Sequence, residues 1–158
     1  MTDASFEDGR EAPLNLGALE AEDLQVISTL IQDSVLPITE LKWQRAQRRF
    51  ALLLNRFRWE DRDAAQARGR RVERVQSILV FDNVVSVASQ GVDRSDPDIV
   101  LSLLSVEFKP GEDAAGEVIL TFAGDGAIRL VVEALEANLR DVTRPYAAPS
   151  GRVPDHGA

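Results

Sequence analysis

The sequence has no cysteine and only one histidine among its 158 residues. The lack of cysteine excludes disulfide bonds, thiolate nucleophiles and cysteine-ligated zinc or iron–sulfur sites. The histidine, His156, lies two residues from the C-terminus in a segment rich in proline and small residues. A general base must be held within hydrogen-bond reach of its target, so this position disfavours the usual nucleophile–histidine catalysts.

Long apolar runs are missing too, and no segment reaches the length needed to cross a bilayer. The opening residues, MTDASFEDGREAP, are acidic and polar and lack the pattern of a secretory signal. We therefore expect a cytoplasmic protein with no membrane partner. The length and the apolar share of 44% suit one domain with a sizeable core. We predict a disordered leader over residues 1–12, a single globular domain over 13–143 and a disordered tail over 144–158.

Positive charge is scarce overall, since 18 Lys and Arg stand against 26 Asp and Glu, but it is concentrated. Residues 42–74 hold 11 bases and 4 acids, a local charge of +7. The rest of the chain holds 7 bases and 22 acids, a charge of −15, which gives the net −8. An acidic protein repels nucleic acid at long range, so a nucleic-acid partner is disfavoured.

Three helices are expected from the local pattern. Apolar residues at helical spacing predict an N-terminal helix over 20–36. The run Asp96-Pro97-Asp98 offers a capping oxygen, a proline at the first helical position and an acid in the first turn, which predicts a short helix over 97–103. A C-terminal helix over 133–142 follows from a second apolar stripe.

Alternating apolar residues predict about seven strands joined by hairpins. One hairpin is expected from strands over 38–44 and 49–59, and another at Asp82-Asn83, a pair suited to a type I′ turn. Residues 127–133 fit a strand as well as a helix. The predicted fold class is α+β, with a mainly antiparallel, strongly curved sheet or small barrel, an N-terminal helix, a short inserted helix and a C-terminal helix.

The arginines at the two ends of the predicted strand over 49–59 are the strongest candidates for a site. Arginine has a planar fork suited to carboxylate and phosphate, and a neighbouring tryptophan supplies a stacking surface. The predicted binding residues are Arg48, Arg49, Arg56, Arg58 and Trp59. The alternative is that these charges keep exposed strand ends soluble and prevent edge-to-edge pairing.

Two other stretches are weaker candidates for a ligand site. In VDRSDPD, Asp93, Asp96 and Asp98 lie close enough to suggest a hard cation, but the glycine and the later glutamate of a calcium loop are missing. In AGDGAIR the glycines suit a hairpin turn, and neither phosphate-loop motif is present. We therefore predict no metal and no cofactor.

Three stretches, RRFALLLNRFRWE, GVDRSDPDIVLSLLSVEF and LTFAGDGAIRL, together resemble a small bacterial family known as domain of unknown function 2948. The likeness covers roughly residues 14 to 143. It implies a single-domain cytoplasmic protein and brings no catalytic or binding residue with it.

Three functions remain open from the sequence. The first is a non-enzymatic binding or accessory domain, whose arginine-rich rim docks an acidic protein or a phosphate-bearing ligand, or serves self-association. The second is a small cofactor-free enzyme that uses carboxylates and arginine in a barrel pocket. The third, a weak RNA binder, is the least favoured because the sequence pI is about 4.7.

Overall fold

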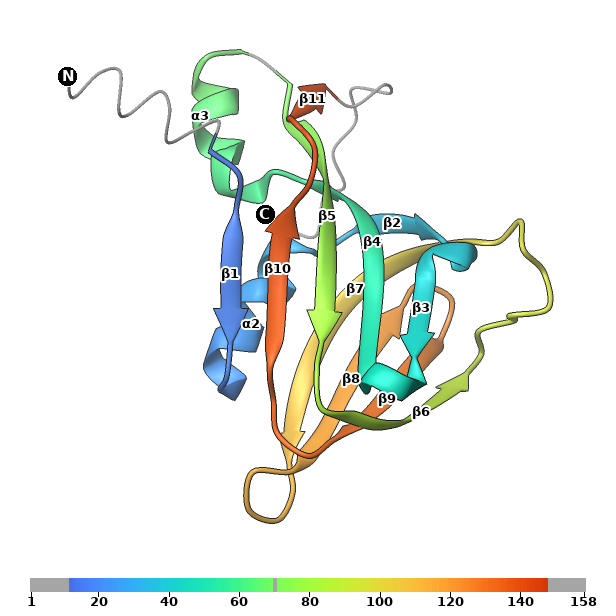
Figure 1. The fold of residues 1–158 in the computed structure, drawn as a ribbon. Helices are drawn as coiled ribbons and strands as arrows, with labels where there is room; N and C mark the ends of the chain where they lie inside the picture. The colour runs from blue at the N-terminus through green and yellow to red at the C-terminus, as the bar shows by residue number, and fades with distance from the viewer. Residues whose placement is uncertain (1–11, 70, 148–158) are drawn as a thin grey trace.

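The computed structural model describes residues 12–69 and 71–147, and these form one curved antiparallel sheet of eleven strands with two short helices (Figure 1). The strands are β1 (Asn15–Ala18), β2 (Ser34–Pro37), β3 (Leu41–Gln44), β4 (Arg49–Phe57), β5 (Glu73–Phe81), β6 (Val84–Gln90), β7 (Val100–Pro110), β8 (Gly116–Phe122), β9 (Gly126–Val132), β10 (Ala137–Asp141) and β11 (Tyr146–Ala147). The helices are α2 (Ala21–Leu30) and α3 (Arg62–Ala67), with single 3₁₀ turns η1 (Ile38–Glu40), η2 (Arg45–Gln47) and η3 (Trp59–Asp61).

The strands follow the order β1-β10-β5-β4-β2-β7-β8-β9-β6, and β11 and β3 pair beside this path with β5 and β4. β4 lies at the bend. One of its edges pairs along its length with β5, and the other is shared by β3, opposite its first half, and β2, opposite Asn55. η1 lies between β2 and β3 in the chain, and both of these strands pair with β4.

The predicted hairpin at Asp82-Asn83 is wrong, although Asn83 has the left-handed backbone, φ 60°, expected of a turn residue. β5 pairs with β10, whereas β6 pairs with β9. The two connections run side by side, since the Asp82 N–H donates to the Glu136 carbonyl and the Glu133 N–H donates to the Asn83 carbonyl. The turn residues therefore make a corner between the halves of the sheet.

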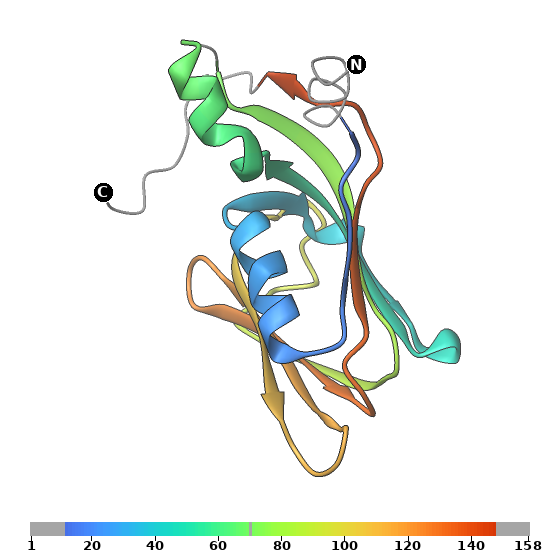
Figure 2. The ribbon, with the colours of Figure 1, turned by 90° about the vertical axis from the view of Figure 1, so that its left-hand side faces the viewer.

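The interior of the curved sheet is apolar, and α2 lies against its concave side (Figure 2). Leu24, Ile27 and Ile31 are buried from the helix side, and α2 packs mainly against β7 and β1. The predicted helix over 20–36 is too long, because α2 ends at Leu30 and β2 begins at Ser34.

The other two predicted helices are strands. Most of the segment predicted as the inserted helix belongs to β7, and the predicted C-terminal helix contains β10, which pairs with both β1 and β5. Burial in β10 alternates, with Ala137 and Leu139 inside, as a strand with one buried face requires. Residues 127–133, which the sequence left undecided between strand and helix, fall almost wholly in strand β9.

The predicted fold class is therefore wrong in its helices and in its strand count, and the small barrel, offered as one form of the curved sheet, is not formed within residues 12–69 and 71–147. Among the described residues, the path of strands ends at β1 on one side and β6 on the other, and these two do not pair. β11 extends the sheet beyond residue 143, where the predicted domain ends. The predicted leader and most of the predicted tail, with His156, lie outside the described residues.

Candidate functional site

The predicted arginine rim is divided between the two ends of β4. Arg48 and Arg49 lie where β4 begins, and Arg56 and Arg58 lie where it ends. Arg56 follows Arg49 by seven positions of extended strand, which corresponds to about 24 Å. The structure therefore does not bring the five predicted residues together into one surface.

Arg56 is wholly buried, with 0% of its surface exposed, so its expected place at a solvated rim is wrong. It lies on the same inward face of β4 as Leu52 and Leu54. Its guanidinium donates to the Glu60 carboxylate at 2.9 Å and to the Asp141 carboxylate at 3.0 Å. The cluster closes one end of the apolar interior.

The Arg56 guanidinium keeps its charge in this place. Burial alone would lower the pKa of Arg56, but hydrogen bonds and attraction from the Glu60 and Asp141 carboxylates outweigh it and raise that pKa above its ordinary value. Asp141 is held in turn by the Ser77 hydroxyl at 2.6 Å and by the Leu14 N–H at 2.8 Å. The network stabilises the fold and leaves Arg56 no donor directed at solvent.

Arg58 and Trp59 are also engaged within the fold. Arg58 is 4% exposed and donates to the Glu73 carboxylate at 2.8 Å. The Trp59 indole N–H donates to the Gln32 carbonyl at 2.9 Å, and its ring packs on Phe57. The Nη1 group of Arg58 and the indole N–H of Trp59 are therefore both bonded within the fold.

Only the η2 end of the predicted rim is exposed. Arg48 contacts Glu133 at 2.7 Å and Arg49 contacts Asp82 at 2.9 Å, both as exposed ion pairs, which are worth little. Lys42 and Arg45 beside them make no ion pair with the described residues. The basic surface that remains is therefore the turn between β3 and β4.

The acidic loop after β6 uses its carboxylates locally. Asp93 accepts hydrogen bonds from the hydroxyl and the N–H of Ser95, which lower the pKa of Asp93, and Asp96 accepts from the Asp98 N–H. Within residues 12–69 and 71–147, no three acidic or histidine side chains are grouped so as to hold a metal ion. The aspartates thus shape the turn that precedes β7.

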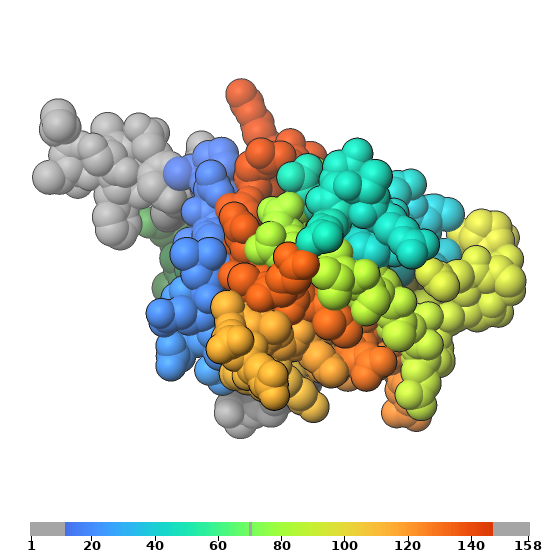
Figure 3. All heavy atoms as spheres, turned by 60° about the horizontal axis from the view of Figure 1, so that its bottom comes forward, coloured from blue at the N-terminus to red at the C-terminus, as the bar shows by residue number. Residues whose placement is uncertain are grey.

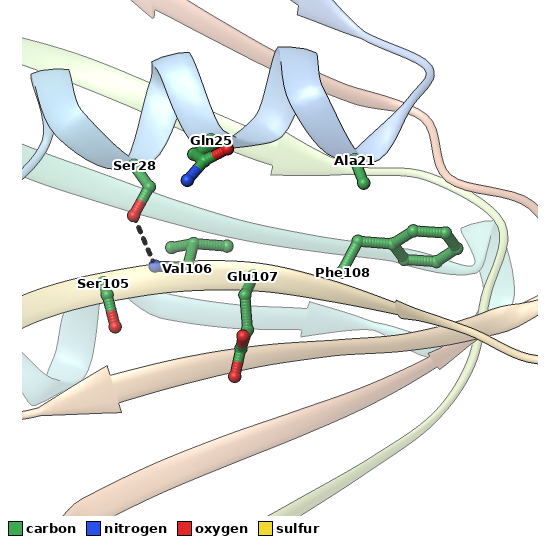
Figure 4. Close-up of a pocket in the computed structure, with 7 residues that line it drawn as sticks. All are labelled: Ala21, Gln25, Ser28, Ser105, Val106, Glu107 and Phe108. Carbon is green, nitrogen blue, oxygen red and sulfur yellow. Dashed lines mark hydrogen bonds between the residues drawn. The ribbon is translucent and has the colours of Figure 1, made fainter.

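A groove of about 400 Å³ runs between α2 and β7 (Figure 4). Residues 105–110 of β7 pair with β8 on one edge, and on the other edge, where α2 lies, they pair with no strand of the described residues. The Ser28 hydroxyl accepts the Val106 N–H at 2.9 Å, while Ser105 and Glu107 point away from the helix. Pro110, at the end of the edge, has no N–H to offer. The helix therefore covers this strand edge.

A second hollow, an apolar cavity of about 140 Å³, lies where the sheet fails to close. Among the described residues, β3 pairs with β4 alone and β6 with β9 alone. β6 begins beside the β3–β4 turn, where the Val84 N–H donates to the Arg48 carbonyl, and the strands then part. Figure 3 shows the teal β3–β4 segment and the yellow-green β6 side by side on one face, with the yellow loop of residues 91–99 at its margin.

The walls of this cavity come from both sides of the opening. One wall belongs to η1, β3 and β4, the other to β6 and β9, and the loop after β6 forms the mouth. The lining residues are Ile38, Thr39, Leu41, Trp43, Phe50, Val87, Ser89, Arg94, Pro97 and Ile128. Phe50 and Ile128 belong to the buried core, so the cavity reaches the interior.

Arg94 is the one charged side chain among those lining residues. It is exposed and makes no ion pair or hydrogen bond with the described residues. An apolar pocket with few convergent polar groups is the usual form of a ligand site. Sequence reasoning missed this site, although VVSVASQ, the whole of β6, is free of charge and proline.

Comparison with known proteins identifies a family. A family described as "Protein of unknown function (DUF2948)" matches residues 14–156. The chain belongs to this family. The predicted resemblance is confirmed, and it brings no function with it. No curated protein and no solved structure matches the chain. In the part of the chain that the structure describes, neither helix has the length and apolar character of a membrane span.

Proposed function

We propose that this chain is a binding domain whose cavity between β3 and β6 receives one compact apolar group of its binding partner. The observation that carries the proposal is the position of the cavity, at the opening between β3 and β6, each of which pairs on one edge only among the described residues. Another protein's apolar cavity of roughly 150 Å³ takes up benzene. The volume of about 140 Å³ therefore suits a group of that size.

Packing supports a binding role for the cavity. Protein interiors are close-packed, and a residual cavity costs stability in proportion to its volume. A group that enters this cavity would contact Phe50 and Ile128 and remove their apolar surface from water. Binding therefore recovers packing that the open sheet lacks.

The lining favours binding over the alternative of a carboxylate enzyme. Such an enzyme needs acids held in its pocket, and the described residues that line this cavity include no aspartate or glutamate. Two exposed bases, Lys42 of β3 and Arg45 of the turn after it, lie on either side of Trp43 in the chain, so an acidic partner remains part of the proposal.

Toluene, a neutral apolar probe, tests the proposed function. Titration into the ¹⁵N-labelled protein is expected to shift the backbone amide signals of Leu41, Trp43 and Val87 in NMR spectra. Val87→Phe fills the cavity from β6 and is expected to abolish those shifts. The matched control, Val85→Phe, places the same side chain at an exposed position of the same strand and is expected to keep them.

The proposed function fails if toluene leaves the cavity amides unmoved up to its solubility limit. It also fails if the folded Val87→Phe variant responds as the wild type does. The spectrum of each variant without toluene shows that it is folded.

A further inference from the structure

The open edge of β6 differs from the other free edges of the sheet. Its seven residues contain no charge and no proline, and only Val84 is buried. The free half of β7 is covered by α2 and ends at Pro110, and β1 is four residues long. Proteins usually protect an edge with charge, proline, shortness or a cover, because unpaired N–H and C=O groups invite another strand. Apart from a bulge between Val84 and Ser86, none of these protects β6 in the part of the chain that the structure describes.

The cavity gives an added strand a place for one side chain. Side chains alternate across a strand, so every second residue of a strand laid along β6 points to the interior. The inward side chains of β6, Val87 and Ser89, line the cavity, as do Leu41 and Trp43 of β3 across the opening. An apolar residue of the added strand would therefore enter the cavity while its backbone pairs with β6.

The basic side chains around the cavity set a second requirement for the partner, a negative charge. Arg94 lines the cavity and has no partner among the described residues, whereas the carboxylates of Asp93 and Asp96 in the same loop accept local hydrogen bonds. Lys42 and Arg45 on the other side of the opening are also exposed and without ion pairs in the described chain. A guanidinium pairs best with a carboxylate, which it can grip with two donors.

We propose that the occupant of this site is an extended segment of a partner protein that adds as a strand along β6. The segment carries an apolar anchor residue for the cavity and an acidic residue near the anchor for Arg94. This inference rests on the proposed function, since it names the partner class of the same cavity. Strand addition takes its affinity from main-chain hydrogen bonds and its selectivity from pockets for alternate side chains.

A phage-displayed library of random twelve-residue peptides, selected on the full chain, supplies the probe. The enriched peptides are expected to share alternating apolar residues and an acid close to one of them. Synthetic copies of the most enriched peptide are then made, each with a single N-methylated residue. One series carries the methyl group at an odd-numbered residue and the other series at an even-numbered residue. Strand pairing requires that one series loses binding at least tenfold and the other keeps it, because successive N–H groups of a strand point to opposite sides.

Two variants locate the pairing on the protein. Ala88→Glu places a charge on the open edge opposite Arg129 of β9, a favourable cross-strand pair that preserves the fold. Ala88→Lys has the opposite charge, and both are expected to weaken the peptide severalfold if the edge itself is the contact. Glu107→Lys on β7 is the control, exposed on the other side of β8 and β9, and is expected to bind as the wild type does.

The inference is overturned if no peptide is enriched, if the two methylated series bind alike, or if both edge variants bind normally. A wild-type dimer that Ala88→Glu and Ala88→Lys convert to monomer would assign the edge to a second copy, and would also overturn it. The toluene titration distinguishes failure of the proposed function from failure of the partner-strand inference. Toluene binding without peptide binding leaves the proposed function standing and rejects the partner strand, whereas loss of both rejects both.

Discussion

The guanidinium of Arg56 and the carboxylate of Asp141 lie in contact inside the sheet, with Nη2 3.0 Å from Oδ1 and 3.2 Å from Oδ2. The two side chains are 0% and 4% exposed. They come from β4 and β10, which are separated by 85 positions in the chain and are both paired to β5. The pair therefore joins the N-terminal and C-terminal parts of the sheet at the end of its apolar interior.

Replacing Arg56 with methionine is expected to lower the free energy of unfolding by about 3–5 kcal/mol, because it leaves the Asp141 carboxylate buried without its cation. Replacing both residues, as Arg56→Met with Asp141→Leu, is expected to restore much of that loss, since a well-packed apolar pair avoids the cost of desolvation. Denaturant unfolding at neutral pH measures the free energy of unfolding of the wild type and of each variant.

The matched control is Arg49→Met, which removes the same kind of side chain from the exposed pair with Asp82. Its expected cost is below about 1 kcal/mol. An equal loss in Arg49→Met and Arg56→Met would contradict the structural role assigned to the buried cluster.

The burial of Arg56 could not be predicted from the sequence, for a physical reason. Within the strand, Arg56 follows Leu54 on one face, and an arginine at that position reads as the point where the face meets water. Arg56 is buried because Asp141 pairs with it. Asp141 lies 85 positions further along the chain, so no local sequence pattern predicts the pair. The concentration of bases over 42–74 is real, but the four arginines predicted to form the rim are all paired with acids within the fold.

The strand and helix errors have a similar origin. Asp96 does bind a backbone N–H two residues ahead, which is the chemistry expected of a cap, but the chain leaves that turn as β7 because β2 and β8 offer it partners. The segment over 133–142 has a helical stripe as well as a strand alternation, and pairing with β1 and β5 decides for the strand. The sequence therefore predicted the turn at Asp96 but not the strands with which β7 and β10 pair.

The candidate cavity shows the same limit. Val87, Trp43 and Arg94 come from three segments whose proximity depends on where the sheet stays open. The uncharged run of β6 was visible in the sequence as a strand. Its status as an unprotected edge follows only from the strand order.

Gly116, at the start of β8, is a position where backbone and ring approach too closely for a side chain. A Cβ there would lie 2.5 Å from the Lys109 carbonyl oxygen and 2.7 Å from the Phe108 ring. Gly116→Ala is therefore expected to destabilise the protein by about 1–3 kcal/mol through overpacking, measured as a lower midpoint of denaturant unfolding.

Gly17→Ala provides the comparison, because a Cβ at Gly17 meets only the Ala137 carbonyl oxygen at 3.9 Å, an ordinary contact. This variant is expected to unfold at the same midpoint or slightly above it, since alanine restricts the unfolded chain more than glycine does. A Gly116→Ala protein as stable as Gly17→Ala would show that β7 and β8 do not approach each other as closely as described.

The hydroxyl of Ser28 accepts the N–H of Val106 at the edge of β7 that pairs with no strand in residues 12–69 and 71–147. Ser28→Ala leaves that donor without its partner under α2, and an unsatisfied buried N–H costs about 1–3 kcal/mol. Thr29→Ala is the matched control on the next residue, where an exposed hydroxyl donates to the Gln25 carbonyl, and its expected effect lies within about 0.5 kcal/mol. Hydrogen exchange distinguishes the two variants further, since the Val106 amide should exchange faster in Ser28→Ala and at the wild-type rate in Thr29→Ala. An unchanged Val106 rate in Ser28→Ala would mean that β7 finds another cover for its edge, and the groove beside α2 would then have to be reconsidered as a second strand-binding surface.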